Sequence, residues 1–216
     1  MRPKAYIKFG LFVFCVGVLS ITSSYAQPFQ KGDDFRLGVQ MGFGTTRLTG
    51  SELESPLNKT GMVIGAYYRQ KLSKNLQLRS EVAFSLRGSR FDFNEENYYN
   101  AIKFTYMDFP IQLMINTSKG DQDQFAVIGV EPAYLMQSEI YVDPYIKAFY
   151  RNYGFKRFDM AALLGYHFDF YYFGLQPSVK IGLININKQI HMPEVLPETG
   201  FNGTIRNLTF DLRFYF

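Results

Sequence analysis

The chain is organised by a two-residue alternation of apolar and polar side chains. In the segment Phe35–Phe43 every odd-numbered residue is apolar and every even-numbered one is glycine or polar. Seven further segments alternate in the same way, near residues 62–70, 76–88, 104–115, 125–136, 158–169, 173–185 and 206–216. Such alternation indicates β-strands with one apolar face. About ten residues is also the length that a tilted strand needs to cross a bilayer.

The connections between these segments alternate in length. Those after the odd-numbered segments are long, at about residues 44–61, 89–103, 137–157 and 186–205, whereas those at 71–75, 116–124 and 170–172 are short. Short periplasmic turns and long external loops are typical of outer-membrane barrels. The pattern therefore predicts an all-β fold over residues 35–216, an eight-stranded antiparallel up-and-down transmembrane β-barrel.

Charged residues of the predicted strands fall on the phase opposite to the apolar one. We expect this because a basic residue facing lipid at the bilayer midplane costs about 2–4 kcal/mol. The inward phase carries six basic and six acidic residues: Arg36, Arg69, Arg79, Glu81, Arg87, Asp108, Glu131, Asp159, Asp169, Lys180, Asp211 and Arg213. Eight strands leave a lumen that side chains can fill, and buried charges need partners. We interpret the twelve as a packed ion-pair network; the alternative is a path for an ion or substrate.

The N-terminus has the features of an export signal. Arg2, Lys4 and Lys8 precede an apolar stretch at 9–21, and the small residues Ser24 and Ala26 place a cleavage site before Gln27. We predict a cleaved signal peptide at 1–26, a short periplasmic segment at 27–34, and export through the Sec pathway to the outer membrane of a Gram-negative bacterium. A retained anchor is the alternative, but the stretch is shorter than the about 20 residues of a membrane-spanning helix.

Removal of residues 1–26 changes the charge and the cysteine count. The signal holds three of the 23 basic residues and none of the 19 acidic ones, so the mature charge is 20 − 19 = +1. This balance argues against a nucleic-acid partner. The only cysteine, Cys15, also leaves with the signal.

Aromatic residues mark the ends of the predicted strands. The last strand alternates to its end, and its apolar positions Phe210, Leu212, Phe214 and Phe216 match the pattern by which barrel-assembly machinery recognises its clients. Further rings near strand ends are expected to form interfacial girdles; they are Tyr67, Tyr68, Phe104, Tyr106, Tyr166, Phe168 and Tyr171 to Phe173.

Several short segments carry a family resemblance. They are the glycine-rich first strand, the stretch 71–82 leading to Gly88, and the segments 106–110, 129–135 and 182–186. In their order and spacing, residues 35–216 resemble the PorT-like family of small outer-membrane β-barrel proteins, found widely in Bacteroidota. The resemblance implies the barrel fold. Since the family takes its name from a secretion-associated protein, it also implies a secretion-related role.

The sequence offers no catalytic, cofactor or metal site. A lipid-modifying barrel enzyme needs a histidine–serine pair at the external rim. His167 falls near the periplasmic end, Ser178 on the next strand has no distinguishing feature, and His191 in the fourth loop has no serine nearby. Two histidines also make a poor metal site. We predict that the protein is not an enzyme and binds no cofactor.

The third long connection is the most distinctive exposed stretch. Between Tyr141 and Arg157 it interleaves aromatic and basic residues, among them Tyr145, Phe149, Tyr150, Arg151 and Tyr153. One interpretation is a docking loop for a protein partner, since Tyr and Arg are enriched in interface hot spots. The other is an interfacial loop whose cations contact lipopolysaccharide phosphates.

We therefore expect an accessory or structural subunit of a larger outer-membrane assembly for secretion or transport. A free-standing barrel for envelope integrity or adhesion is the alternative, and a lipid-modifying enzyme is a distant one. The expected partners are outer-membrane lipid and lipopolysaccharide, the barrel-assembly machinery during biogenesis, and the larger protein complex.

Overall fold

The computed structural model of the chain describes residues 35–50, 56–91, 99–118, 123–142, 148–151, 155–188 and 203–216. The predicted signal peptide and the segment 27–34 lie outside the described residues. No helix in the described ranges is long and apolar enough to cross a membrane.

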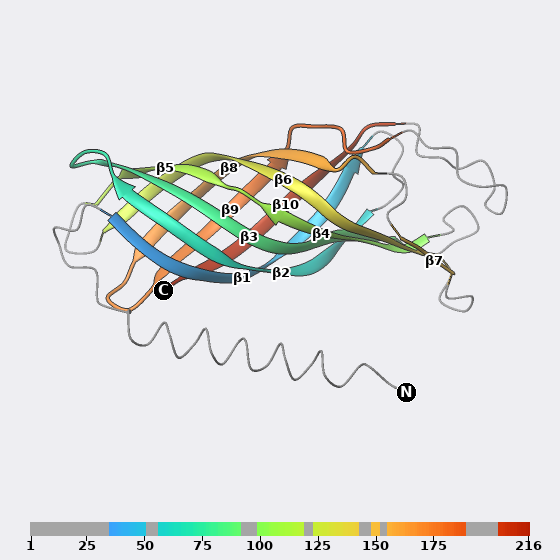
Figure 1. Ribbon diagram of the computed structural model, residues 1–216, viewed down its shortest axis with the longest axis horizontal. Helices are drawn as coiled ribbons and strands as arrows, with labels where there is room; N and C mark the ends of the chain where they lie inside the picture. Colours follow the sequence, from blue (N-terminus) through green and yellow to red (C-terminus); the bar gives the residue numbers. More distant parts are fainter. Residues whose placement is uncertain are drawn as a thin grey trace.

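One antiparallel sheet closes on itself to form a barrel (Figure 1). Its strands are β1 (Phe35–Gly50), β2 (Pro56–Lys71), β3 (Leu76–Phe91), β4 (Tyr99–Asp108), β5 (Ile111–Asn116), β6 (Gln124–Val142), β7 (Ala148–Arg151), β8 (Phe158–Asp169), β9 (Gly174–Gly182) and β10 (Ile205–Tyr215). They fill eight positions in the ring, because β4 and β5 together lie between β3 and β6, and β7 is a short addition to β6. The predicted eight-stranded barrel is confirmed, with one position divided.

The division between β4 and β5 lies at Phe109 and Pro110. Proline lacks the N–H group that a strand in the middle of a sheet donates to its neighbour. The surrounding backbone stays bonded, because the Phe109 N–H donates to Pro132 O (2.8 Å) and the Glu81 N–H donates to Pro110 O (2.9 Å). The wall of the barrel therefore continues across the break.

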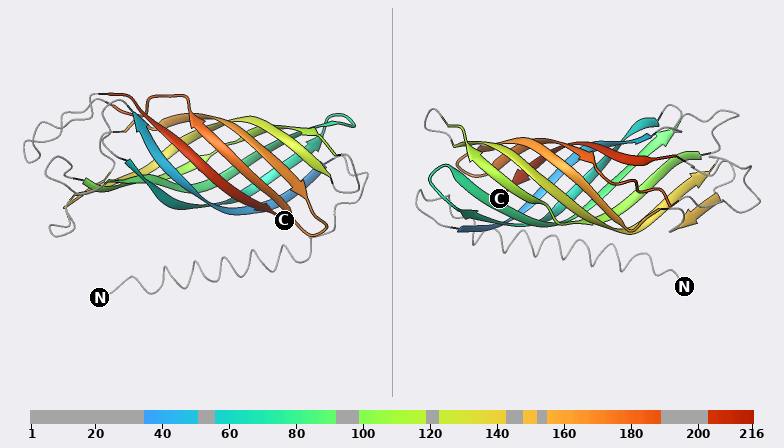
Figure 2. Two further views of the ribbon diagram at one scale, coloured as in Figure 1. Left: turned by 180° about the vertical axis from the view of Figure 1, so that it is seen from behind. Right: turned by 90° about the horizontal axis from the view of Figure 1, so that it is seen from above.

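The first and last strands close the ring. Residues Gln40–Gly50 of β1 pair with Ile205–Tyr215 of β10 in reverse order. Beyond this ladder, the Val39 and Phe216 backbones bond to each other in both directions, at 3.1 and 2.9 Å. Figure 2 shows the same wall of tilted strands from behind and from above.

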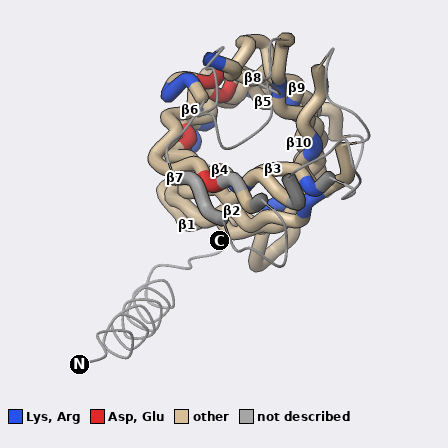
Figure 3. Tube along the Cα trace, turned by 90° about the vertical axis from the view of Figure 1, so that its right-hand side faces the viewer, with Lys and Arg blue, Asp and Glu red and all other residues tan. Residues whose placement is uncertain are grey.

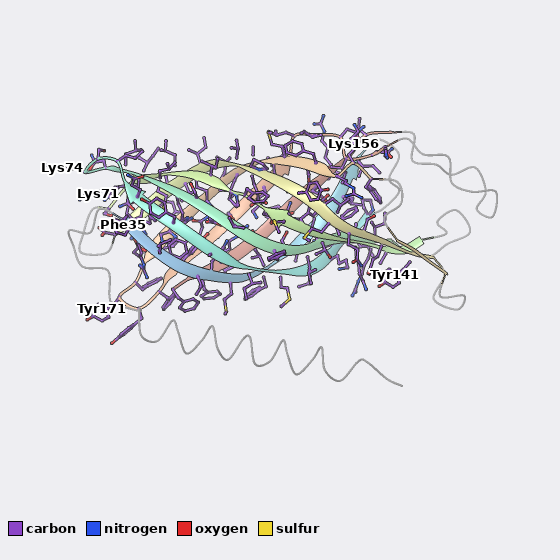
Figure 4. All side chains as sticks on the ribbon, viewed as in Figure 1. Phe35, Lys71, Lys74, Tyr141, Lys156 and Tyr171 are labelled. Atoms are coloured by element: carbon purple, nitrogen blue, oxygen red, sulfur yellow. The ribbon has the colours of Figure 1, made fainter. Side chains whose placement is uncertain are left out.

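The barrel has two unlike ends. The connections 72–75 and 170–173, the end of β5 and the start of β6 lie at one end, here called the turn end, together with Phe35. The ends of β1 and β3, the starts of β2 and β4, and the paired strands β6 and β7 lie at the other, the loop end. Figure 4 shows Phe35, Lys71 and Tyr171 at the turn end, and Tyr141 and Lys156 at the loop end.

An apolar belt surrounds the barrel nearer the turn end. Its exposed side chains include Leu37, Met62, Phe84, Ile128, Leu164, Ile181 and Phe210. On β1 the belt runs from Phe35 to Phe43. At about 3.3 Å per residue and a tilt of about 40°, this length corresponds to roughly 20 Å, close to the apolar band of about 25 Å on membrane barrels.

At the loop end the pattern of the side chains is inverted. Leu48, Ile102 and Ile205 face inward and are at most 1% exposed, whereas the exposed Arg47 and Arg206 face outward. Apolar side chains inside and polar side chains outside are expected here, because the outward groups contact water or lipid head groups.

The strands consequently extend further than predicted at the loop end. The expected connections 44–61, 89–103 and 137–157 are wrong in extent, since they contain residues of β1, β2, β3, β4, β6 and β7. The prediction recognised strands by apolar residues that face outward, which occurs only within the membrane. It therefore missed the strand ends where apolar residues face inward and polar residues face outward.

The expected aromatic girdles are partly wrong. Tyr67, Phe104 and Tyr106 are inside the barrel, at 3%, 1% and 0% exposure, while Tyr171 and Tyr172 at the turn end are well exposed. Inside, the Phe104 ring packs edge-on against Phe155, with 4.7 Å between centroids. Aromatic residues at strand ends therefore fill the interior as well as line its rim.

Candidate functional site: the barrel interior and the loop end

The barrel encloses the charged residues of the inward phase. Ten of the twelve predicted residues are at most 9% exposed: Arg69, Arg79, Glu81, Arg87, Asp108, Glu131, Asp159, Lys180, Asp211 and Arg213. The Asp169 side chain is 11% exposed, and Arg36 is only partly buried. Buried charged residues from seven strands, β2, β3, β4, β6, β8, β9 and β10, thus lie in one interior.

Arg213 on β10 is in the middle of this network. Its guanidinium contacts Glu81 at 2.6 Å, Asp211 at 3.1 Å and Glu131 at 3.2 Å. Glu81 also pairs with Arg79 Nε at 3.0 Å. The contact between Arg213 and Glu81 joins residues 132 positions apart in the chain, so the network crosses the lumen and ties distant strands together.

A second layer lies nearer the loop end. Lys180 Nζ contacts Glu131 and Asp211, each at 2.7 Å. Arg87 pairs with Asp108 at 2.6 Å and also with Glu131. Because each of these carboxylates has a basic partner, ion pairing offsets the cost of burying the charges.

The remaining acidic residues lie toward the two ends. Asp159 accepts a hydrogen bond from the Asn207 amide at 2.7 Å. At the turn end, Asp169 pairs with Arg69 at 2.7 Å and contacts His167 Nε2 at 2.9 Å. The network therefore extends through most of the barrel length.

Neutral residues complete the network, and the sequence interpretation missed them. Gln40, Gln112, Gln176 and Tyr215 are at most 2% exposed. Glu81 accepts hydrogen bonds from Gln40 and Gln112, each at 2.6 Å, and from the Tyr215 hydroxyl at 3.0 Å. Their inward phase is visible in the alternation, but the predicted network contained only charged side chains.

Packed side chains fill the lumen that the backbone ring in Figure 3 encloses. A cavity bordered by Arg87, Lys180 and Asp211 has a volume of about 20 Å³, which is space for about one water molecule. Toward the loop end, the buried Leu48, Ile102, Phe104, Phe155, Ile186 and Ile205 form an apolar plug. This interior is built to hold the wall together.

The candidate catalytic groups have structural partners. His167 is 1% exposed, its ring contacts Arg79 Nη1 at 3.2 Å and Asp169, and it packs edge-on against Tyr215. The Ser178 hydroxyl donates to Asp211. His191 lies outside the described residues. Within the described ranges, no group of three His, Cys, Asp or Glu side chains is arranged to hold a metal ion.

The predicted assembly motif lies on the outer surface of β10. Phe210 and Phe216 are 52% and 39% exposed, and the Phe214 ring packs against Phe43 and Phe173. The motif therefore contributes to the apolar belt next to the closure between β1 and β10.

Only part of the predicted docking loop is described. Residues Phe149, Tyr150 and Arg151 belong to β7, which pairs with Glu139–Tyr141 of β6. Tyr145 and Tyr153 lie outside the described residues. Among the described strands, β7 pairs with β6 alone. In Figure 1 this hairpin extends past the rim of the barrel.

A match to a family model agrees with this architecture. The family model described as an outer membrane protein beta-barrel domain matches residues 25–188. No curated protein is significantly similar in sequence. Among solved structures, the attachment invasion locus protein Ail of Yersinia pestis is 10% identical with a TM-score of 0.42, over 85% of this chain and 99% of that one. Neisserial surface protein A (NspA) is 9% identical with a TM-score of 0.46, over 84% and 98% of the two chains.

The family match covers more than half of the 216 residues, and the closed wall, apolar belt and charged interior are those of a membrane barrel. The chain belongs to the family of outer membrane protein beta-barrel domains and is a barrel of the Gram-negative outer membrane.

Proposed function

We propose that this barrel is a non-enzymatic accessory subunit of a larger outer-membrane assembly for secretion or transport, as a relative of the PorT-like proteins. The loop end faces out of the cell, in keeping with the short periplasmic turns of outer-membrane barrels. The observation that carries the proposal is the β6–β7 hairpin, which extends the wall beyond the rim on one side.

The hairpin suits strand-mediated docking. A strand with an unpaired edge can accept a strand of another protein through backbone hydrogen bonds, and among the described residues β7 pairs on one side only. The stretch around it contains Tyr145, Phe149, Tyr150, Arg151 and Tyr153, of types that dominate binding energy at interfaces. The chemistry it fits is an extended segment of a protein partner.

The packed interior favours a function located on the surface. Arg79, Arg213 and Glu81 are fully enclosed by hydrogen bonds and ion pairs within the chain, so a substrate entering the lumen would have to displace this network. Breaking a buried ion pair by removing one partner costs about 3–5 kcal/mol. Transport through the centre and catalysis inside it are therefore disfavoured.

The second candidate function is a free-standing barrel that supports envelope integrity or adhesion. The exposed cations of the loop end, such as Arg47, Lys156 and Arg206, favour it, because they match the phosphates of lipopolysaccharide in the surrounding leaflet. In either case the barrel-assembly machinery would insert the chain, with the last strand as its recognition motif.

The two candidate functions differ in whether a protein partner co-purifies with the barrel. The barrel is extracted from native membranes in a mild detergent, and co-purifying proteins are identified and quantified. A stoichiometric partner that is lost in Y145S/F149S/Y153S supports the accessory role.

The matched control is Y171S/Y172S, which removes exposed aromatic rings at the opposite end (Figure 4) and should retain the partner. If the parent elutes alone at the size of one barrel, and its deletion alters only envelope permeability or attachment, the free-standing role replaces the accessory one.

A further inference from the structure

Three basic residues of adjacent strands come together at the loop end. Arg90 of β3 pairs with Ala101 of β4, and Lys103 of β4 pairs with Gly88 of β3. The neighbours Ile102 and Phe104 face the interior, so Lys103 faces outward. Arg90 is exposed on the same face.

Lys59 of β2 reaches this pair across a glycine. Its Cδ lies 3.1 Å from the point that a Cβ of residue 88 would occupy, and such a Cβ would also lie 2.0 Å from the Ile102 carbonyl oxygen. Only glycine at position 88 leaves room for this approach. The charged groups that act on the half-buried Lys59 are those of Lys103, Arg90 and Glu139.

The cluster carries an excess of positive charge. Among the described residues that act on Lys59, Glu139 is the one acidic residue, so the balance of these described charges is 3 − 1 = +2. The Glu139 carboxylate accepts hydrogen bonds from Gln137 and from the Tyr141 hydroxyl. Lys103 Nζ lies 4.0 Å from the Tyr141 ring centroid. Within the described part of the chain, none of the three cations forms an ion pair within 4 Å.

The cluster lies directly beyond the apolar belt. On β3 the outward positions Val82, Phe84 and Leu86 are exposed and apolar, and Gly88 and Arg90 follow. Four residues from Leu86 to Arg90 correspond to a height of about 10 Å at the strand rise and tilt of such barrels. This is the depth of lipid head groups next to the hydrocarbon core.

We propose that Lys59, Arg90 and Lys103 form a binding site for a phosphate group of lipid A in the outer leaflet. The acyl chains of the same molecule lie along Met62, Phe84 and Leu86, and the phosphate lies between the three cations. The proposal rests on the outward orientation of the loop end adopted above and is independent of any protein partner.

Native mass spectrometry of the folded barrel in detergent with EDTA tests the site, because EDTA removes divalent ions that could bridge phosphates. The lipids titrated are lipid A with both phosphates and lipid A without phosphate; inorganic phosphate is added as a competitor. The variant K59Q/K103Q is compared with K71Q/K74Q, which removes the same charge at the turn end (Figure 4). Each basic residue near a lipid surface is worth about fivefold in affinity, so K59Q/K103Q should weaken binding about twenty-fivefold.

The expected result is phosphate-dependent binding that K59Q/K103Q and, to a smaller extent, R90Q weaken and K71Q/K74Q does not. Equal binding of the two lipids, or equal loss in both double variants, overturns the proposal. If millimolar inorganic phosphate by itself abolishes lipid A binding, the cluster is a site for free anions, and the lipid assignment is overturned.

Folding and the proposed function are controlled separately. The heat-dependent shift in gel mobility checks that every variant is folded before binding is measured. A protein partner, if one co-purifies with the parent, should remain bound in K59Q/K103Q. Loss of lipid A binding with retention of the partner therefore separates this site from the β6–β7 hairpin.

Discussion

Replacing Arg213 by methionine removes a fully buried cation that contacts three carboxylates. Methionine keeps much of the apolar volume of the arginine stem but none of its donors. Glu81, Asp211 and Glu131 would lose contacts of 2.6, 3.1 and 3.2 Å. The substitution therefore leaves the interior with one more negative charge than its remaining partners neutralise.

The cost follows from what the carboxylates retain. Glu81 keeps Arg79 at 3.0 Å, and Asp211 and Glu131 both keep Lys180 at 2.7 Å. Removing one partner of a buried pair costs about 3–5 kcal/mol. Because no carboxylate is left without a cation, we expect the lower end, a loss of about 3 kcal/mol in the free energy of unfolding.

The loss is measured by urea unfolding of the barrel in lipid vesicles, read as the fraction of the fast-migrating folded band on gels. The control is Arg206→Met, the same change on the same strand at an exposed position, which should stay within about 0.5 kcal/mol of the parent. Adding Asp211→Asn to Arg213→Met should restore part of the stability through a coupling of about 1 kcal/mol. If Arg213→Met is as stable as Arg206→Met, the interior charges are not a dry, interdependent network.

Three further predictions test the lumen, the N-terminus and the orientation. Because side chains fill the interior and the cavity near Lys180 has a volume of only about 20 Å³, planar-bilayer recordings should show no stable channel; reproducible nanosiemens steps would refute the closed lumen. The protein purified from outer membranes should begin at Gln27, and N-terminal sequencing that finds Met1 contradicts the signal peptide. With Cys15 removed in the mature chain, an impermeant maleimide should label Thr60→Cys on intact cells and leave Tyr172→Cys unlabelled; the reverse pattern would invert the barrel.

The sequence by itself determined the class of fold and the face of most side chains. Lipid offers no hydrogen bonds to backbone groups, so a spanning sheet must close and show apolar side chains outward. Because of that requirement, apolar and polar residues alternate with a two-residue period along each strand. From this period alone, Arg79, Glu81 and Arg213 could be placed inside the barrel.

The tertiary structure decided which inward groups meet and where the strands end. A two-residue period specifies a face but not a height, so the contact between Arg213 and Glu81 depends on the register of closure between β1 and β10. Outside the membrane, the apolar residues of the two-residue period need not face outward. There Ile102 faces inward and Lys103 faces outward. The apolar interior and the outward cations of the loop end therefore depend on the height at which the apolar belt ends on each strand. Only the closed barrel shows this height.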